Sequence, residues 1–254
     1  MKLQRSGMLL GVVAAALMLG NVASAASISG QFNLAGSVFV SNTMIDFGFD
    51  TKVTPLPPGD QAAGVVLPAT GSFAGLNVTD VVSLHNLDIT VQTPGPPFPT
   101  PDTNWIELGV NPTSVGTTSS VDINVDLTQI PINSAVMACV PGTSYANGTI
   151  CRANNGPIEL SQGPTGTTAI LNLVGKAHTA GETDFSALTG KFSANFANFT
   201  IEQLLALFQR QGFIETSWSA NFVAAPPVPE PSSLALLGAG LLGLGFWGRK
   251  KVAR

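Results

Sequence analysis

The sequence predicts a mainly β protein, an antiparallel β-sandwich of the jelly-roll kind, flanked by a helical targeting segment at each end. Three observations support this fold class. Several segments alternate apolar and polar residues with a period of two, which is typical of strands with one buried face. Clusters of Gly, Pro, Asn and Asp separate these segments. Charged residues make up only 10% of the chain and hydrophobic residues 44%, which argues against both a coiled coil and wholesale disorder.

The first element is a secretory signal peptide over residues 1–25. Lys2 and Arg5 precede an apolar run over residues 8–19, and the small residues Ala23 and Ala25 then occupy the positions that a signal peptidase reads. A retained membrane helix is the alternative, but the apolar run is short for that role. We therefore expect cleavage after Ala25 and export of the chain that follows.

Residues 26–223 are expected to form the β-sandwich. The alternation is clearest over residues 28–40, 121–127 and 214–222, where apolar side chains occupy every second position. Further candidate strands lie at residues 80–91, 104–110, 169–176 and 190–199. Because each strand has one apolar face, two stacked sheets are the natural way to bury those faces.

One short helix is expected within this domain. Thr200 is a good N-cap, Gln203 completes a capping box, and Gly212 is suited to end the helix. The apolar side of the segment is formed by leucines and a phenylalanine. We expect this helix to cap an open end of the sandwich rather than to bind a partner, because exposed apolar helices are uncommon in monomers.

A proline-rich segment interrupts the domain. Residues 93–101 contain five prolines, which excludes a central strand because proline lacks the amide hydrogen that a ladder needs. The segment is either a stiff surface loop or a boundary between two subdomains. We favour the loop, because neither half of the domain has a clear core of its own.

The only two cysteines, Cys139 and Cys151, are expected to form a disulfide, since an exported protein meets an oxidising compartment. The alternative is a cysteine nucleophile, which would need a reduced thiol close to His85 or His178. Oxidising conditions argue against that alternative.

Asp122, Asn124 and Asp126 resemble the start of a calcium-binding loop, because oxygen ligands at this spacing suit a hard cation. Leu127, however, stands where such a loop needs glycine, and no glutamate follows at the twelfth position. The favoured interpretation is the polar face of a strand, with a calcium-dependent binding module as an alternative. No cofactor is predicted.

The chain contains neither a G-x-S-x-G nor an H-E-x-x-H motif. His85 lies near Asp88, and His178 near Glu182 and Asp184, but single histidines in strand-like segments are more often structural. We therefore predict no enzymatic activity. A glycosidase needs only two carboxylates a few ångströms apart. A surface polysaccharide hydrolase, with Asp122 and Asp126 as the pair to test, therefore stays the alternative.

The C-terminal segment has three features in a fixed order. A proline-rich linker over residues 224–231 ends in Pro229, Glu230 and Pro231, and residues 232–248 form an uncharged apolar stretch. As a helix this stretch would span about 25 Å, near the lower limit for crossing a bilayer. The tail of residues 249–254 is basic and is expected to stay in the cytoplasm. Its cations are Arg249, Lys250, Lys251 and Arg254.

This segment resembles the PEP-CTERM sorting signal of Gram-negative, exopolysaccharide-producing bacteria. The resemblance covers about the last 27 residues. It implies that an exosortase recognises Pro229-Glu230-Pro231 and that the tail is then removed. The precursor would thus be anchored in the inner membrane, and the mature chain would be attached at the cell surface or released into the matrix. The resemblance says nothing about the activity of residues 26–223.

Charge restricts the possible partners. Residues 26–231 contain five Lys and Arg and fifteen Asp and Glu, so their net charge is −10. Such a chain should repel nucleic acid and anionic lipid surfaces. The leading interpretation is a non-enzymatic cell-surface or matrix protein that works by adhesion or by association with exopolysaccharide in a biofilm matrix.

Overall fold

The computed structural model describes residues 27–41, 44–48, 61–78, 81–90, 92–108, 121–182 and 184–226. The predicted signal peptide, sorting motif, membrane segment and basic tail lie outside these residues, and the predicted domain limits stay predictions. The described strands are β1 (Gly30–Ser41), β2 (Met44–Gly48), β3 (Gln61–Leu67), β4 (Val81–His85), β5 (Leu87–Asp88), β6 (Asp102–Leu108), β7 (Ile123–Gln129), β8 (Ile150–Arg152), β9 (Glu159–Gln162), β10 (Gly166–Thr179), β11 (Ser186–Ala197) and β12 (Phe213–Ala225).

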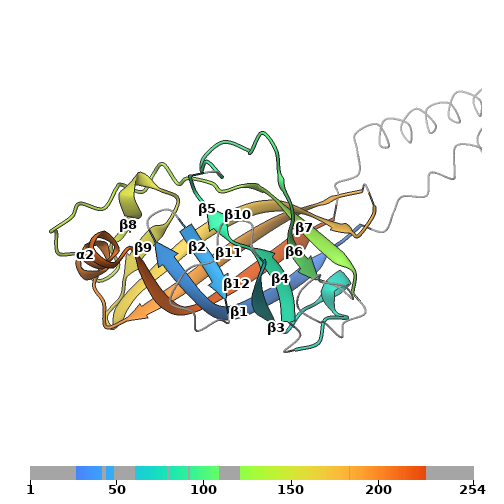
Figure 1. Ribbon diagram of the computed structural model, residues 1–254, viewed down its shortest axis with the longest axis horizontal. Helices are drawn as coiled ribbons and strands as arrows, with labels where there is room; N and C mark the ends of the chain where they lie inside the picture. The colour runs from blue at the N-terminus through green and yellow to red at the C-terminus, as the bar shows by residue number, and fades with distance from the viewer. Residues whose placement is uncertain are drawn as a thin grey trace, which may run out of the picture.

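Eight of these strands close into an antiparallel barrel (Figure 1). Hydrogen-bonded neighbours follow the order β11, β12, β1, β3, β4, β6, β7 and β10, and β10 pairs with β11 to complete the ring. The predicted mainly β character is confirmed, but the predicted β-sandwich is wrong, because the sheet is continuous around the ring. Closure also leaves the ring without a free sheet edge, which protects it from edge-to-edge association.

Long strands explain the closure. β1, β10, β11 and β12 each have 12 to 14 residues, and β10 pairs with β11 from Gly166 to Ala177. On its other edge β10 pairs first with β9 and then with β7. Long strands accumulate twist and tilt, which brings the two ends of one sheet together. Side chains alternate in the same way in a sandwich and in a barrel, so the alternation predicted strands but not closure.

The interior of the barrel is an aromatic core. Phe32 stacks on Phe222 with ring centroids 4.8 Å apart, and Trp218 lies 5.0 Å from Phe47 and 5.6 Å from Phe192. These rings come from β1, β2, β11 and β12, and all five are nearly or fully buried. Because they contact one another across the interior, the barrel is filled by side chains.

Two glycines make room for these rings. A Cβ at Gly36 would lie 2.8 Å from Nε1 of Trp218, and a Cβ at Gly190 would lie even closer, 2.5 Å, to Cε1 of Phe222. Both positions face inward, so glycine is needed there because an aromatic ring occupies the space of a side chain.

The predicted helix is present as α2 (Ile201–Gln211). The hydroxyl of Thr200 accepts from the amide of Gln203, and Oε1 of Gln203 accepts from the amide of Thr200, which confirms the capping box. Its buried face consists of Ile201, Leu204, Leu205 and Phe208. Figure 1 shows α2 at one end of the barrel, where β11 ends and β12 begins. The helix therefore packs on the end of the fold, as expected.

The predicted disulfide between Cys139 and Cys151 is present, with the two Cα atoms 4.9 Å apart. Backbone bonds hold the two chain segments together beside it: the amide of Cys139 donates to the carbonyl of Arg152, and the amide of Arg152 to the carbonyl of Met137. The disulfide thus closes a loop whose two ends are also joined by backbone hydrogen bonds.

The proline-rich segment is a loop, as predicted. It joins β5 to β6, and two backbone hydrogen bonds tie it to β7 and to the residue that follows β7: the amide of Phe98 donates to the carbonyl of Thr128, and the amide of Gly95 to that of Ile130. The most regular predicted strands all form, with ends shifted by a few residues. β2, β3, β8 and β9 were not predicted, because they are short or, like β3, rich in Ala and Gly and so lack a clear alternation.

Within the residues that the structure describes, no helix has the length and apolar character needed to span a membrane. The predicted membrane segment, residues 232–248, is not among them.

Candidate functional site

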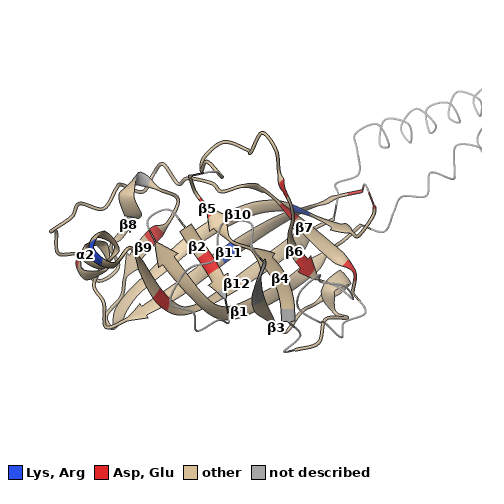
Figure 2. Cartoon of the chain, in the orientation of Figure 1, with Lys and Arg blue, Asp and Glu red and all other residues tan. Residues whose placement is uncertain are grey.

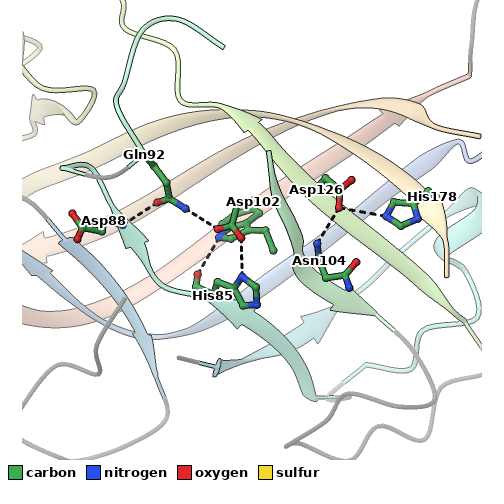
Figure 3. Close-up of polar contacts among 8 residues, drawn as sticks. His85, Asp88, Gln92, Asp102, Asn104, Asp126 and His178 are labelled. Atoms are coloured by element: carbon green, nitrogen blue, oxygen red, sulfur yellow. Dashed lines mark hydrogen bonds and ion pairs between the residues drawn. The ribbon is translucent and has the colours of Figure 1, made fainter. Parts of the chain in front are cut away.

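The polar side chains that the fold brings together lie on the outer face of β4, β6, β7 and β10. Both histidines of the chain pair there with an aspartate from a neighbouring strand (Figure 3). Nδ1 of His85 lies 2.9 Å from Oδ1 of Asp102, and Nε2 of His178 lies 3.4 Å from Oδ1 of Asp126. The nearby acids considered from the sequence, Asp88 for His85 and Glu182 or Asp184 for His178, are not the partners found.

The first network links the proline-rich loop to the barrel. Asp102 also accepts a hydrogen bond from the side-chain amide of Gln92 at 2.7 Å, and Oε1 of Gln92 accepts from the amide of Asp88 at 2.9 Å. The indole of Trp105 donates to the carbonyl of His85 at 3.0 Å. The side chains of His85 and Asp102 are about one fifth exposed. The imidazole is thus oriented by a carboxylate, the arrangement that positions a general base.

The hydrogen bond to Asp102 raises the pKa of His85 above its ordinary value. Burial acts in the opposite direction, and the negative charges of Asp102 and Glu107 add to the increase. A group whose folded-state pKa is raised stabilises the fold fully below its unfolded pKa, which for histidine is 6.5. That stabilisation is lost as the pH rises through the folded-state pKa.

We therefore expect the stabilisation of the protein by His85 to be larger at about pH 5 than at about pH 8. The measurement compares the melting temperatures of wild type and His85→Gln across this range, and the difference between them should shrink as the pH rises. Asp102→Asn removes the main cause of the shift and should flatten the dependence. A wild-type advantage that grew with pH would contradict this assignment.

The second network is built around a bulge in β6. Residues 103–105 lie opposite Asp126 alone, because the register with β7 shifts between Asp102 and Ile106. Asn104 adopts a left-handed backbone conformation, with φ of 54°, and its amide donates to Oδ1 of Asp126 at 2.9 Å. The carboxylate thus satisfies an amide hydrogen that the ladder does not pair.

The bulge also changes the direction of Trp105. Strict alternation would send Trp105 and Ile106 to opposite faces, but both are fully or almost fully buried. The indole ring lies 6.0 Å from Phe222 and 6.3 Å from Phe47, which belong to the core. The only sequence feature that indicated this bulge is Asn104, because asparagine tolerates the left-handed backbone region.

Of the calcium candidates, Asn124 and Asp126 lie on β7 and Asp122 directly precedes this strand. Asn124 donates to Oδ1 of Asn104 at 3.1 Å, and Asp126 is engaged by Asn104 and His178. Four residues of a strand span about 13 Å, so one cation could not bind Asp122 and Asp126 together. Among the described residues, no three His, Cys, Asp or Glu side chains gather at one point.

The same distance also tests Asp122 and Asp126 as the catalytic carboxylates of a polysaccharide hydrolase. Side chains stand roughly perpendicular to a strand, so the carboxyl groups of Asp122 and Asp126 lie about 13 Å apart, as their Cα atoms do. Glycosidases place their two carboxyl groups about 5 to 9.5 Å apart. This geometry does not suit these two residues as a catalytic pair.

Sequence reasoning missed Asp102, Gln92 and Asn104. Asp102 is 17 residues from His85 along the chain and reaches it only because β4 and β6 pair. No local pattern signals such a partner. Figure 2 shows that the positions of acidic residues are spread over the fold and that basic positions are few, so charge clustering did not mark the site either.

Comparison with known proteins identifies one segment. Residues 227–250 match the PEP-CTERM protein-sorting motif. The match confirms the sorting signal at Pro229-Glu230-Pro231 that the sequence predicted, and it shows an exported protein that is sorted by an exosortase. No curated protein and no solved structure matches the chain. Cleavage after Ala25 and a cytoplasmic position of Arg249 to Arg254 stay predictions.

Proposed function

We propose that this chain is a non-enzymatic surface or matrix protein that associates with the extracellular polysaccharide of the producing cells. The observation that carries the proposal is the PEP-CTERM motif at residues 227–250, which marks an exported protein for sorting by an exosortase. The barrel interior is packed with aromatic side chains, so the outer face is the surface that can meet a polymer.

The charge of the exported chain supports a carbohydrate partner. Residues 26–231 carry a net charge of −10, which disfavours nucleic acid and anionic lipid. Neutral sugar units carry no charge to be repelled and offer hydroxyl groups to the Asn, Ser and Thr side chains of the outer strand faces. Hydrogen bonding of this kind would let the protein attach to the polymer without catalysing a reaction.

The test is binding to the polymer itself. The full chain, held in a non-ionic detergent without a sugar headgroup, is mixed with matrix polysaccharide purified from the producing cells. Size separation coupled to light scattering should show protein co-eluting with polymer of undiminished length. No co-elution, together with a normal matrix in a deletion strain, would contradict the proposal.

The same experiment addresses the alternative. Shortened polymer would support a polysaccharide hydrolase instead, and the His85–Asp102 pair would be the first place to look for its base, because Asp102 orients that imidazole. Asn substitution of Asp102 should then abolish the shortening.

A further inference from the structure

An aromatic ring stands beside the second polar network on the outer face of the barrel. Asn124 of β7 is paired with His178 of β10, and the adjoining pair Ala177 with Ser186 places Phe185 opposite His178. The ring centroids of His178 and Phe185 are 5.0 Å apart. Phe185 nevertheless keeps 42% of its surface exposed, although a phenylalanine is ordinarily buried.

The ring is held in place on one side. Nζ of Lys176 lies 5.3 Å from its centroid, and the imidazole of His178 packs against it in a T-shaped arrangement. His178 is in turn fixed by Asp126 and by the carbonyl of Thr179, at 3.4 and 3.1 Å from its two ring nitrogens. The exposed part of the ring is therefore a preorganised apolar surface.

Polar groups continue from this ring across β7 to β6. The hydrogen bonds that join Asn124, Asn104 and Asp126 fix the planes of two amides and a carboxylate. Among the described residues, Nδ2 of Asn104 and Oδ1 of Asn124 have no hydrogen-bond partner, and both residues are partly exposed. An acceptor on Asn124 and a donor on Asn104 are thus open to solvent on the same face as the aromatic ring, two and three strands away, which is roughly 10 and 14 Å at the usual strand spacing.

A pyranose ring has the complementary chemistry. One of its faces is lined by C–H groups, which pack on an aromatic ring, and its rim carries hydroxyls that both donate and accept hydrogen bonds. We infer that Phe185, Asn124 and Asn104 form a contact site for a short run of neutral pyranose units of a polysaccharide, with one unit on the aromatic ring and the following units beside the two amides. This inference rests on the proposed function and assigns it to one place on the barrel.

Charge selects a neutral sugar over an acidic one. Asp126 lies within the site, and Asp122, Glu182 and Asp184 are exposed in the segments that adjoin β7, β10 and β11. The amide of Ala180 donates to the carbonyl of Asp122, which places the two segments side by side. Lys176 is the one cation in this set, so the local field repels a uronic acid unit.

The test compares variants of the full chain in the same detergent. Phe185→Ala should weaken binding to the matrix polysaccharide about tenfold, because it removes the aromatic surface on which the sugar packs. Phe199→Ala is the matched control, because Phe199 is a phenylalanine of similar exposure, 37%, that lies in the turn before α2. Its binding should stay within about twofold of wild type, with thermal unfolding confirming that both variants fold.

A second variant separates stacking from apolar packing. Phe185→Leu keeps an apolar side chain against His178 but removes the flat ring, and it should weaken binding nearly as much as alanine. Dextran and alginate serve as neutral and acidic probe polymers, and dextran should be bound more tightly than alginate.

The outcomes distinguish this site from the proposed function. If wild type binds the matrix polysaccharide and Phe185→Ala binds equally well, the site inference is overturned and the proposed function stands. Binding retained by Phe185→Leu, or tighter binding of alginate than of dextran, also overturns it as stated. A wild-type chain that binds none of the three polymers contradicts the proposed function as well.

Discussion

Replacing Trp218 with alanine is expected to lower the free energy of unfolding by about 3 to 5 kcal/mol, the largest effect of a single substitution that we predict. The indole is 4% exposed and contacts the rings of Phe47 and Phe192. It also fills the space left by Gly36, and its Nε1 donates to the carbonyl of Ser37 at 3.0 Å. Alanine would leave a cavity that surrounding strands, fixed by pairing on both sides, cannot collapse into.

The measurement is urea unfolding of the full chain followed by circular dichroism in the far ultraviolet. Val223→Ala is the matched control, because Val223 lies on the same strand with 41% of its surface exposed. It should change the free energy of unfolding by no more than about 0.5 kcal/mol. Equal losses for the two variants would show that the ring of Trp218 is not part of the core.

Removing the disulfide is expected to lower the free energy of unfolding by about 3 kcal/mol. The bond between Cys139 and Cys151 closes a short loop and restricts the unfolded chain. The double variant Cys139→Ala/Cys151→Ala suits the test, because both side chains are almost fully buried and alanine leaves no unpaired polar atom.

A reductant supplies the control for this second prediction. Wild type should lose a similar stability when the disulfide is reduced, whereas the double variant should unfold at the same urea concentration with and without reductant. If reduction left wild type unchanged, the bond would not contribute to stability. The two predictions address separate regions, so their effects should add when combined.

Local patterns predicted the elements whose structure depends on near neighbours. The alternation in residues 121–127 and 214–222 corresponds to β7 and β12, and the cap at Thr200 begins α2. Cys139 and Cys151 form the predicted disulfide. β3 and β8 were missed for different reasons. β3 contains Ala and Gly where a clear apolar alternation would be needed, and β8 has only three residues, too few to show a period of two.

The candidate sites depended on contacts that no local pattern specifies. Asp102 reaches His85 through the pairing of β4 with β6, and Asp126 reaches His178 through the pairing of β7 with β10. The bulge at Asn104 supplies the amide that Asp126 binds. The acidic partner of each histidine is thus an aspartate from a neighbouring strand and not one of the acids nearest to it in the chain.

The sequence alone determined that this is an exported protein with a PEP-CTERM sorting signal, because a sorting enzyme reads a short contiguous motif. It also determined the mainly β character, since the period of two arises within each strand. Only the tertiary structure decided that the strands close into a barrel and which side chains meet on its outer face. Closure depends on β1 pairing with β12 and on β7 pairing with β10, and these hydrogen bonds join segments so far apart in the chain that no local pattern specifies them.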